Sequence, residues 1–169
     1  MRTASVFLAA AGIIALVAAP APAGCAADGP EGVLACYAAA FAGMDVAALE
    51  RLLAEDYQWL VVMPPEVSVF SRADVIKLSD GMLSDADVES VSMSFADGYG
   101  TAPAGGADEW ILHDVKVTLE LTFTPGSEKG VDSYSIESCL TLYVRKVAGT
   151  ESEYEVYREV NFEGLGCGR

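Results

Sequence analysis

The second half of the chain alternates between apolar and polar residues over three long segments. Most odd positions from 111 to 123 are apolar, and their neighbours are charged or hydroxyl residues. Even positions repeat the pattern from 134 to 144 and again from 154 to 162. Because successive side chains of a strand point to opposite faces, this pattern predicts an antiparallel sheet with one covered face.

Helical spacing dominates the segment before these strands. Apolar residues recur every three or four positions from Val33 to Met44, which predicts a first helix from Pro30 to about Gly43. Asp45 is a suitable N-cap for a second helix. Two helices at the start of an otherwise β-rich chain indicate that helices cover the apolar face of the sheet.

One strand and a third helix complete the order of elements. The apolar run 59–63 predicts a strand that Pro64 and Pro65 end, and a capping box at 71–74 predicts the start of a helix. The sequence contains no internal repeat and no second domain. The predicted class is therefore α+β, with N-terminal helices packed into a strongly curved antiparallel sheet.

The N-terminal residues have the composition of a secretory leader. Arg2 precedes an apolar stretch over 4–19, and small residues and prolines follow up to Gly24. This pattern predicts a signal peptide over 1–24 and a periplasmic or cell-envelope location. The stretch is short for a bilayer-spanning helix.

Two cleavage sites fit this leader. Cleavage after Ala23 leaves Gly24 at the N-terminus, whereas Ala23-Gly24-Cys25 resembles the end of a lipobox, in which Cys25 is lipidated. Pro22 stands where such boxes usually carry Leu. Both outcomes stay open, with residues 25–29 expected to form a short tether.

Charge and cysteine content restrict the partners. The chain has 10 Lys and Arg against 25 Asp and Glu, a net charge of −15, which excludes nucleic acid as a partner and leaves a lipid at Cys25 as the only membrane contact. Export would place Cys36, Cys139 and Cys167 in an oxidising compartment, with their pairing left open. A single His and the lack of a CxxC motif predict no metal and no cofactor.

Several segments carry a resemblance to a known superfamily. Residues 37–57 run as helix, short break with Asp45, helix, and Leu-x-x-Asp-aromatic; Ser71-Arg72 begins the third helix; and 154–158 is similar to a closing Trp-x-Ile strand. Over 30–163 the chain resembles the nuclear transport factor 2-like superfamily, which includes ketosteroid isomerases, scytalone dehydratases and polyketide cyclases, and it is similar to exported bacterial lipoproteins of that superfamily. The resemblance implies a cone-shaped domain with a pocket, followed by a tail over 164–169.

The resemblance does not carry over isomerase chemistry. In ketosteroid isomerases, a Tyr on the first helix polarises the substrate and an Asp on the first strand removes the proton. Tyr37 matches the first position, but the position of the base falls on Val62. Tyr37 and Trp59 are therefore expected in the core or in the lining of the pocket.

Three polar residues share the spacing of the apolar face. His113, Tyr134 and Arg158 fall on positions that the alternation places inside the fold. Since a buried Arg needs a partner, Arg158 either pairs with an internal acid such as Asp56 or Glu66, or receives a ligand in a pocket with His113 and Tyr134.

The opposite sheet face suits contact with a second copy. Glu137, Thr141 and Tyr143 lie on it, so we expect either a homodimer through this face or a solvated surface. The function expected first is binding of a small molecule or protein without catalysis. The alternatives are an acid/base isomerase, dehydratase or hydrolase that uses His113, and a dimerisation module with a filled cone.

Overall fold

The computed structural model describes residues 25–162 and Cys167. The predicted leader over 1–24 and all of the predicted tail except Cys167 lie outside the described residues. None of the described helices is long and apolar enough to cross a membrane.

Between residues 25 and 162, three helices precede or interrupt the first long strands. They are α1 (Gly32–Ala42), α2 (Val46–Leu52) and α3 (Arg72–Leu83). Asp45 caps α2 by accepting a hydrogen bond of 2.8 Å from the backbone N–H of Ala48. The capping box predicted at the start of α3 is present, with reciprocal bonds between Ser71 and Asp74. Local sequence signals therefore placed the starts of α2 and α3 correctly.

Eight strands of the described part of the chain form a single mixed sheet. They are β1 (Cys25–Ala26), β2 (Leu53–Met63), β3 (Glu66–Ser71), β4 (Val88–Phe95), β5 (Gly100–Pro103), β6 (Glu109–Phe123), β7 (Ser133–Lys146) and β8 (Glu153–Phe162). The order is β3-β2-β8-β7-β6-β4, with β1 paired to β8 and β5 paired to β6. All pairs are antiparallel except β2 with β8. The predicted α+β class is confirmed, with the parallel pair as an addition.

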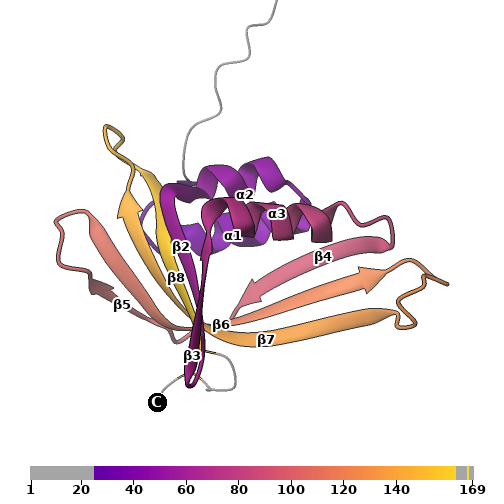
Figure 1. The fold of residues 1–169 in the computed structure, drawn as a ribbon. Helices are drawn as coiled ribbons and strands as arrows, with labels where there is room; N and C mark the ends of the chain where they lie inside the picture. The colour runs from indigo at the N-terminus through magenta and orange to yellow at the C-terminus, as the bar shows by residue number, and fades with distance from the viewer. Residues whose placement is uncertain (1–24, 163–166, 168–169) are drawn as a thin grey trace, which may run out of the picture.

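The sheet curves around the helices, which lie over its concave face (Figure 1). Helix α1 packs against β4 and against α2. Five of the most deeply buried side chains come from β6, β7 and β8: Leu112, Val115, Leu142, Val144 and Val156. The core therefore lies between the helices and the concave face, where the alternation predicts it.

A β-bulge in β6 interrupts this alternation. The register with β7 shifts between Leu112 and Val115, and Asp114 has a positive φ of 59°. Leu112 and Val115 both point inward, so His113 lies on the outer face and is exposed. The expectation that His113 points inward is wrong, because the bulge reverses the order of faces along the strand.

A second bulge in β8 has the larger consequence for the site. Val156 pairs with Val144, but Arg158 pairs with Tyr143, so Tyr157 is an extra residue. Beyond this point Arg158 points outward and Glu159 points inward. The predicted inward position of Arg158 is therefore wrong for the same reason as that of His113.

Two disulfides tie the ends of the described chain to the domain. Cys25 pairs with Cys36, linking β1 to α1, and Cys139 pairs with Cys167, linking β7 to the C-terminal residues. A sulfur in a disulfide cannot also form the thioether of a lipid anchor, so this pairing is incompatible with lipidation of Cys25. Cys25 and Ala26 also pair with β8, so the start of the predicted tether belongs to the sheet.

Candidate functional site

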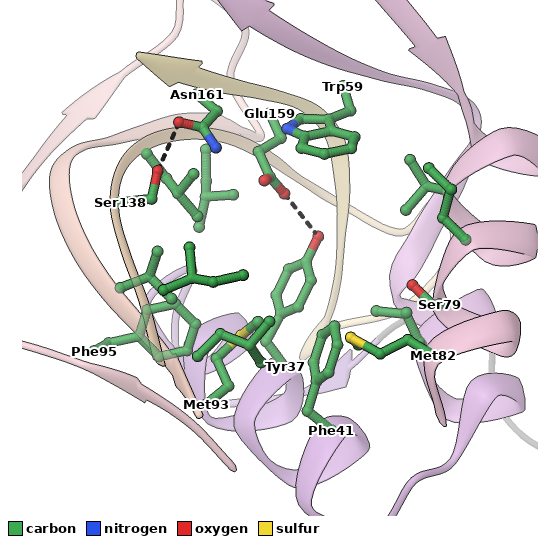
Figure 2. A pocket seen from close by; sticks show the side chains of 18 of the residues that line it. Tyr37, Phe41, Trp59, Ser79, Met82, Met93, Phe95, Ser138, Glu159 and Asn161 are labelled. Carbon is green, nitrogen blue, oxygen red and sulfur yellow. Dashed lines mark hydrogen bonds between the residues drawn. The ribbon is translucent and has the colours of Figure 1, made fainter. Parts of the chain in front are cut away.

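A cavity of about 320 Å³ lies between the helices and the concave face of the sheet. Its volume falls within the range of ligand pockets, at the lower end. Much of its wall is aromatic or sulfur-containing: Phe41, Trp59, Met82, Met93 and Phe95 (Figure 2). The cone is therefore not filled by its own side chains, and the expectation of a filled cone is wrong.

The mouth of the cavity lies between α3 and the start of β7. Leu78 of α3 and Ile136 of β7 both line the cavity, yet 55% and 43% of their surfaces are exposed. Exposed apolar side chains at a cavity rim give an apolar molecule a favourable entry surface.

A carboxyl group stands at the inner end of the cavity. Glu159 Oε2 accepts hydrogen bonds from the hydroxyls of Tyr37 on α1, at 3.3 Å, and Tyr57 on β2, at 3.2 Å. Both tyrosines are buried, with 6% and 3% of their surfaces exposed. Three elements thus bring one acid and two phenols together at one end of a mainly apolar cavity.

The surroundings bring the pKa of the Glu159 carboxyl close to neutral pH. Burial raises the pKa of Glu159 from 4.5 to about 7, although the bonds from Tyr57 and Tyr37 act in the opposite direction. Burial first, and then the charge of Glu159, raise the pKa of Tyr37 and of Tyr57 well above 10. The tyrosines therefore remain donors at neutral pH, and Glu159 can gain or lose a proton there.

Further polar groups flank Glu159. Trp59 on β2 is its direct partner across the parallel β2–β8 pair, and the Trp59 ring packs on Phe70 with centroids 5.0 Å apart. Asn161 follows Glu159 by two residues on β8, and its Oδ1 accepts a hydrogen bond of 2.6 Å from Ser138 Oγ. Figure 2 shows Trp59, Glu159 and Asn161 at the same end of the cavity.

The structure separates the residues that the sequence predicts as a site. Tyr37 and Trp59 line the cavity, although their role in ligand binding stays a prediction. His113, Tyr134 and Arg158 are exposed and lie outside the cavity lining. The predicted grouping of these three residues in a pocket is wrong.

Each of the three displaced residues has its own surroundings. His113 Nδ1 lies 2.9 Å from Asp114 Oδ2. Tyr134 is on the same face of β7 as the core residues, as predicted, but it lies at the start of the strand, where 57% of its surface is exposed. The Arg158 guanidinium lies over the Tyr143 ring, 5.6 Å from its centroid. Asp56, a predicted partner of Arg158, instead pairs with Arg145 at 2.7 Å.

Sequence reasoning missed Glu159 and Tyr57. Strict alternation from Val156 places Glu159 on the outer face, and only the bulge at Tyr157 turns it inward. The one available signal was the polar group Arg158, Glu159 and Asn161 near the end of this strand, interrupted by Val160. Such a group is compatible with either face until the register is known.

The sequence matches no protein-family model and no curated protein. Solved structures nevertheless share its fold. A nuclear transport factor 2-like protein of unknown function in nutrient uptake from Rhodospirillum rubrum has a TM-score of 0.59 and 14% identity, over 82% of this chain and 100% of that one. A nuclear transport factor 2-like superfamily protein from Salmonella enterica has a TM-score of 0.59 and 7% identity, over 83% of this chain and 89% of that one.

A protein described as a scytalone dehydratase, from Novosphingobium aromaticivorans, is similar at a TM-score of 0.57 and 14% identity, over 78% of both chains. At such identities the likeness concerns the fold. The chain has the nuclear transport factor 2-like fold, as the resemblance implied. Because this fold hosts unrelated activities, the function must be argued from the cavity itself.

Proposed function

We propose that the cavity binds a small, mainly apolar molecule whose single polar group sits beside Glu159. The observation that carries this proposal is one buried carboxyl, held by two tyrosines, at the inner end of a mainly apolar cavity. Apolar walls supply affinity in proportion to the area they bury, and a few polar groups orient the ligand.

The charge of the lining restricts the ligand. None of the residues that the structure places around the cavity is Lys, Arg or His. A carboxylate ligand would be desolvated there without a counter-ion, beside Glu159 and in a protein of net charge −15. The proposed ligand is therefore not an anion.

A cavity-filling pair of variants tests this function. Leu119 lines the cavity from β6, whereas the neighbouring Thr118 lies on the opposite face of the same strand. Calorimetric titration with fluorene, a flat three-ring hydrocarbon, should show binding to the wild type and to Thr118→Trp. Leu119→Trp should lose that binding, since its indole occupies the cavity. Equal binding by the two variants would place the ligand elsewhere.

Acid/base catalysis is the second candidate, with Glu159 in place of His113. A pKa of about 7 suits a group that both takes and gives a proton near neutral pH. Such an enzyme would exchange protons on the carbon beside the carbonyl of a bound ketone. Deuterium uptake from heavy water into cyclic ketones, followed by mass spectrometry, measures this. Exchange that Glu159→Gln abolishes supports catalysis, and binding without exchange supports a pure binding role.

Export and a homodimer complete the proposal. Two disulfides, Cys25–Cys36 and Cys139–Cys167, favour an oxidising compartment. On the outer face the rings of Tyr143 and Tyr157 lie 5.9 Å apart, with Arg145 and Arg158 over them. Tyr and Arg are enriched in protein interfaces, so this face suits a second copy. Light scattering of the wild type and of Tyr143→Glu tests the dimer, which the added charge should separate.

A further inference from the structure

The inner end of the cavity contains a donor that no described residue pairs with. Trp59 Nε1 is buried and has no hydrogen-bond partner among the residues that the structure describes. Buried polar groups nearly always have partners, because an unpaired one forfeits its bond to water. Within the described residues the indole N–H of Trp59 therefore has no acceptor, and a molecule in the cavity is placed to supply one.

The groups around this N–H define what that acceptor must be. Trp59 stands beside Glu159 in the β2–β8 register, and both line the cavity. Glu159 Oε2 already accepts from two tyrosines, so Glu159 Oε1 is the oxygen left for a ligand. In its protonated form, Glu159 donates from that oxygen alongside Trp59.

Asn161 adds a third polar group on the same face of β8. Its Oδ1 is engaged by Ser138, and Figure 2 shows its amide nitrogen directed away from Ser138. The inner end of the cavity is thus rich in donors. Indole has no acceptor at all, so a ligand group that only donates would leave the Trp59 N–H unpaired.

We propose that the polar group of the ligand is a hydrogen-bond acceptor, such as the carbonyl oxygen of a ketone, which accepts a hydrogen bond from Trp59 Nε1 beside Glu159. This inference rests on the proposed function and names the ligand class: uncharged, mainly apolar ring compounds that carry a carbonyl group. The carbonyl faces Trp59 and Glu159, and the rings lie against the aromatic and methionine wall. Amines and carboxylic acids of the same shape are poorer ligands.

Four compounds of similar shape separate these classes: fluorene, fluorenone, aminofluorene and fluorene carboxylic acid. Calorimetry with the wild type should give an affinity for fluorenone about thirtyfold above that for fluorene, since the ketone also satisfies a buried donor. Aminofluorene and the acid should bind no better than fluorene.

The residue test compares Trp59→Phe with Trp110→Phe. Phe keeps an aromatic ring but removes the N–H, so the fluorenone-to-fluorene affinity ratio should fall to about threefold in Trp59→Phe. Trp110 packs on Tyr154 and does not line the cavity, so Trp110→Phe should keep the wild-type ratio. The ratio does not depend on the folded fraction, because both compounds are measured on the same preparation.

The outcomes separate the inference from the function beneath it. Three results would overturn the acceptor inference while leaving the binding cavity in place. They are equal affinities for fluorene and fluorenone, tighter binding of aminofluorene than of fluorene, and a fluorenone-to-fluorene affinity ratio that stays at the wild-type value in Trp59→Phe. Absence of binding by fluorene, fluorenone and aminofluorene would overturn the proposed function, and the inference with it.

Discussion

Glu159 determines the chemical character of the cavity, because its charge state changes near neutral pH. Its pKa in the folded protein is about 7, against 4.5 for an ordinary Glu. Below pH 4.5, both the folded and the unfolded chain hold the Glu159 proton, and the contribution of this group to stability is at its full value. As the pH rises towards 7 the unfolded chain loses the proton first, so stability falls, and above 7 the loss levels off.

This linkage predicts a difference between the wild type and Glu159→Gln. The wild type should lose about 3 kcal/mol of unfolding free energy across this range relative to the variant, which cannot titrate at this position. Urea denaturation at a series of pH values measures the difference. Other titrating groups, such as Asp56 with its lowered pKa, affect both proteins alike and cancel.

The exposed Glu137 provides the matched control. Glu137→Gln removes one negative charge from the outer part of β7 and should follow the wild-type curve. A Glu159→Gln curve parallel to that of the wild type would mean that the Glu159 carboxyl is solvated rather than buried.

The two tyrosines should tune the same titration. Each hydroxyl stabilises the ionised form of Glu159, so Tyr37→Phe and Tyr57→Phe should each raise the pKa of Glu159 further, by about one unit. NMR of the labelled Glu159 carboxyl carbon across a pH series follows the change. A pKa that stays the same in both variants would contradict the hydrogen bonds to Oε2.

At the scale of elements, the sequence specifies the secondary structure better than it specifies the site. Apolar alternation and capping residues such as Asp45 and Ser71 located the long strands and helix starts, because these signals are local. The bulges at Asp114 and Tyr157 depend on cross-strand register, which no local signal reveals. Tyr37 and Trp59 were therefore predicted near the pocket, while Glu159 was missed and Arg158 was misplaced.

The bulge in β6 yields a prediction of its own. Asp114 holds a φ of 59°, which glycine adopts without steric cost and alanine does not. Asp114→Ala should therefore be less stable than Asp114→Gly by about 1 kcal/mol. Both variants lose the same side-chain contacts, so their difference in chemical denaturation isolates the backbone. Equal stabilities of Asp114→Ala and Asp114→Gly would show that residue 114 does not hold a left-handed backbone conformation.

The cap of α3 matters because this helix forms one wall of the cavity mouth. Ser71→Ala removes the capping box and should lower the free energy of unfolding by about 1 kcal/mol. Ser68 on the same strand, β3, does not cap a helix, so Ser68→Ala is the control in thermal denaturation. A loss of stability in Ser68→Ala but not in Ser71→Ala would contradict the assigned cap.

The whole molecule combines an open cavity with covalent ties at both ends of the described chain. The disulfide Cys139–Cys167 closes a sequence separation of 28 residues, and Cys25–Cys36 closes one of 11. Removing either pair by double Ser substitution should cost about 2–4 kcal/mol. Denaturation of each double variant measures this cost. Four free thiols in the purified, unreduced protein would contradict both pairings.

The cavity beside Glu159 is proposed as a ligand site, and a crystal structure of the protein grown with fluorenone tests this proposal. We expect density for the three rings inside the cavity, with the carbonyl oxygen at hydrogen-bond distance from Trp59 Nε1 and next to Glu159. Fluorenone bound at the outer face, or a cavity filled by inward-turned side chains, would contradict it.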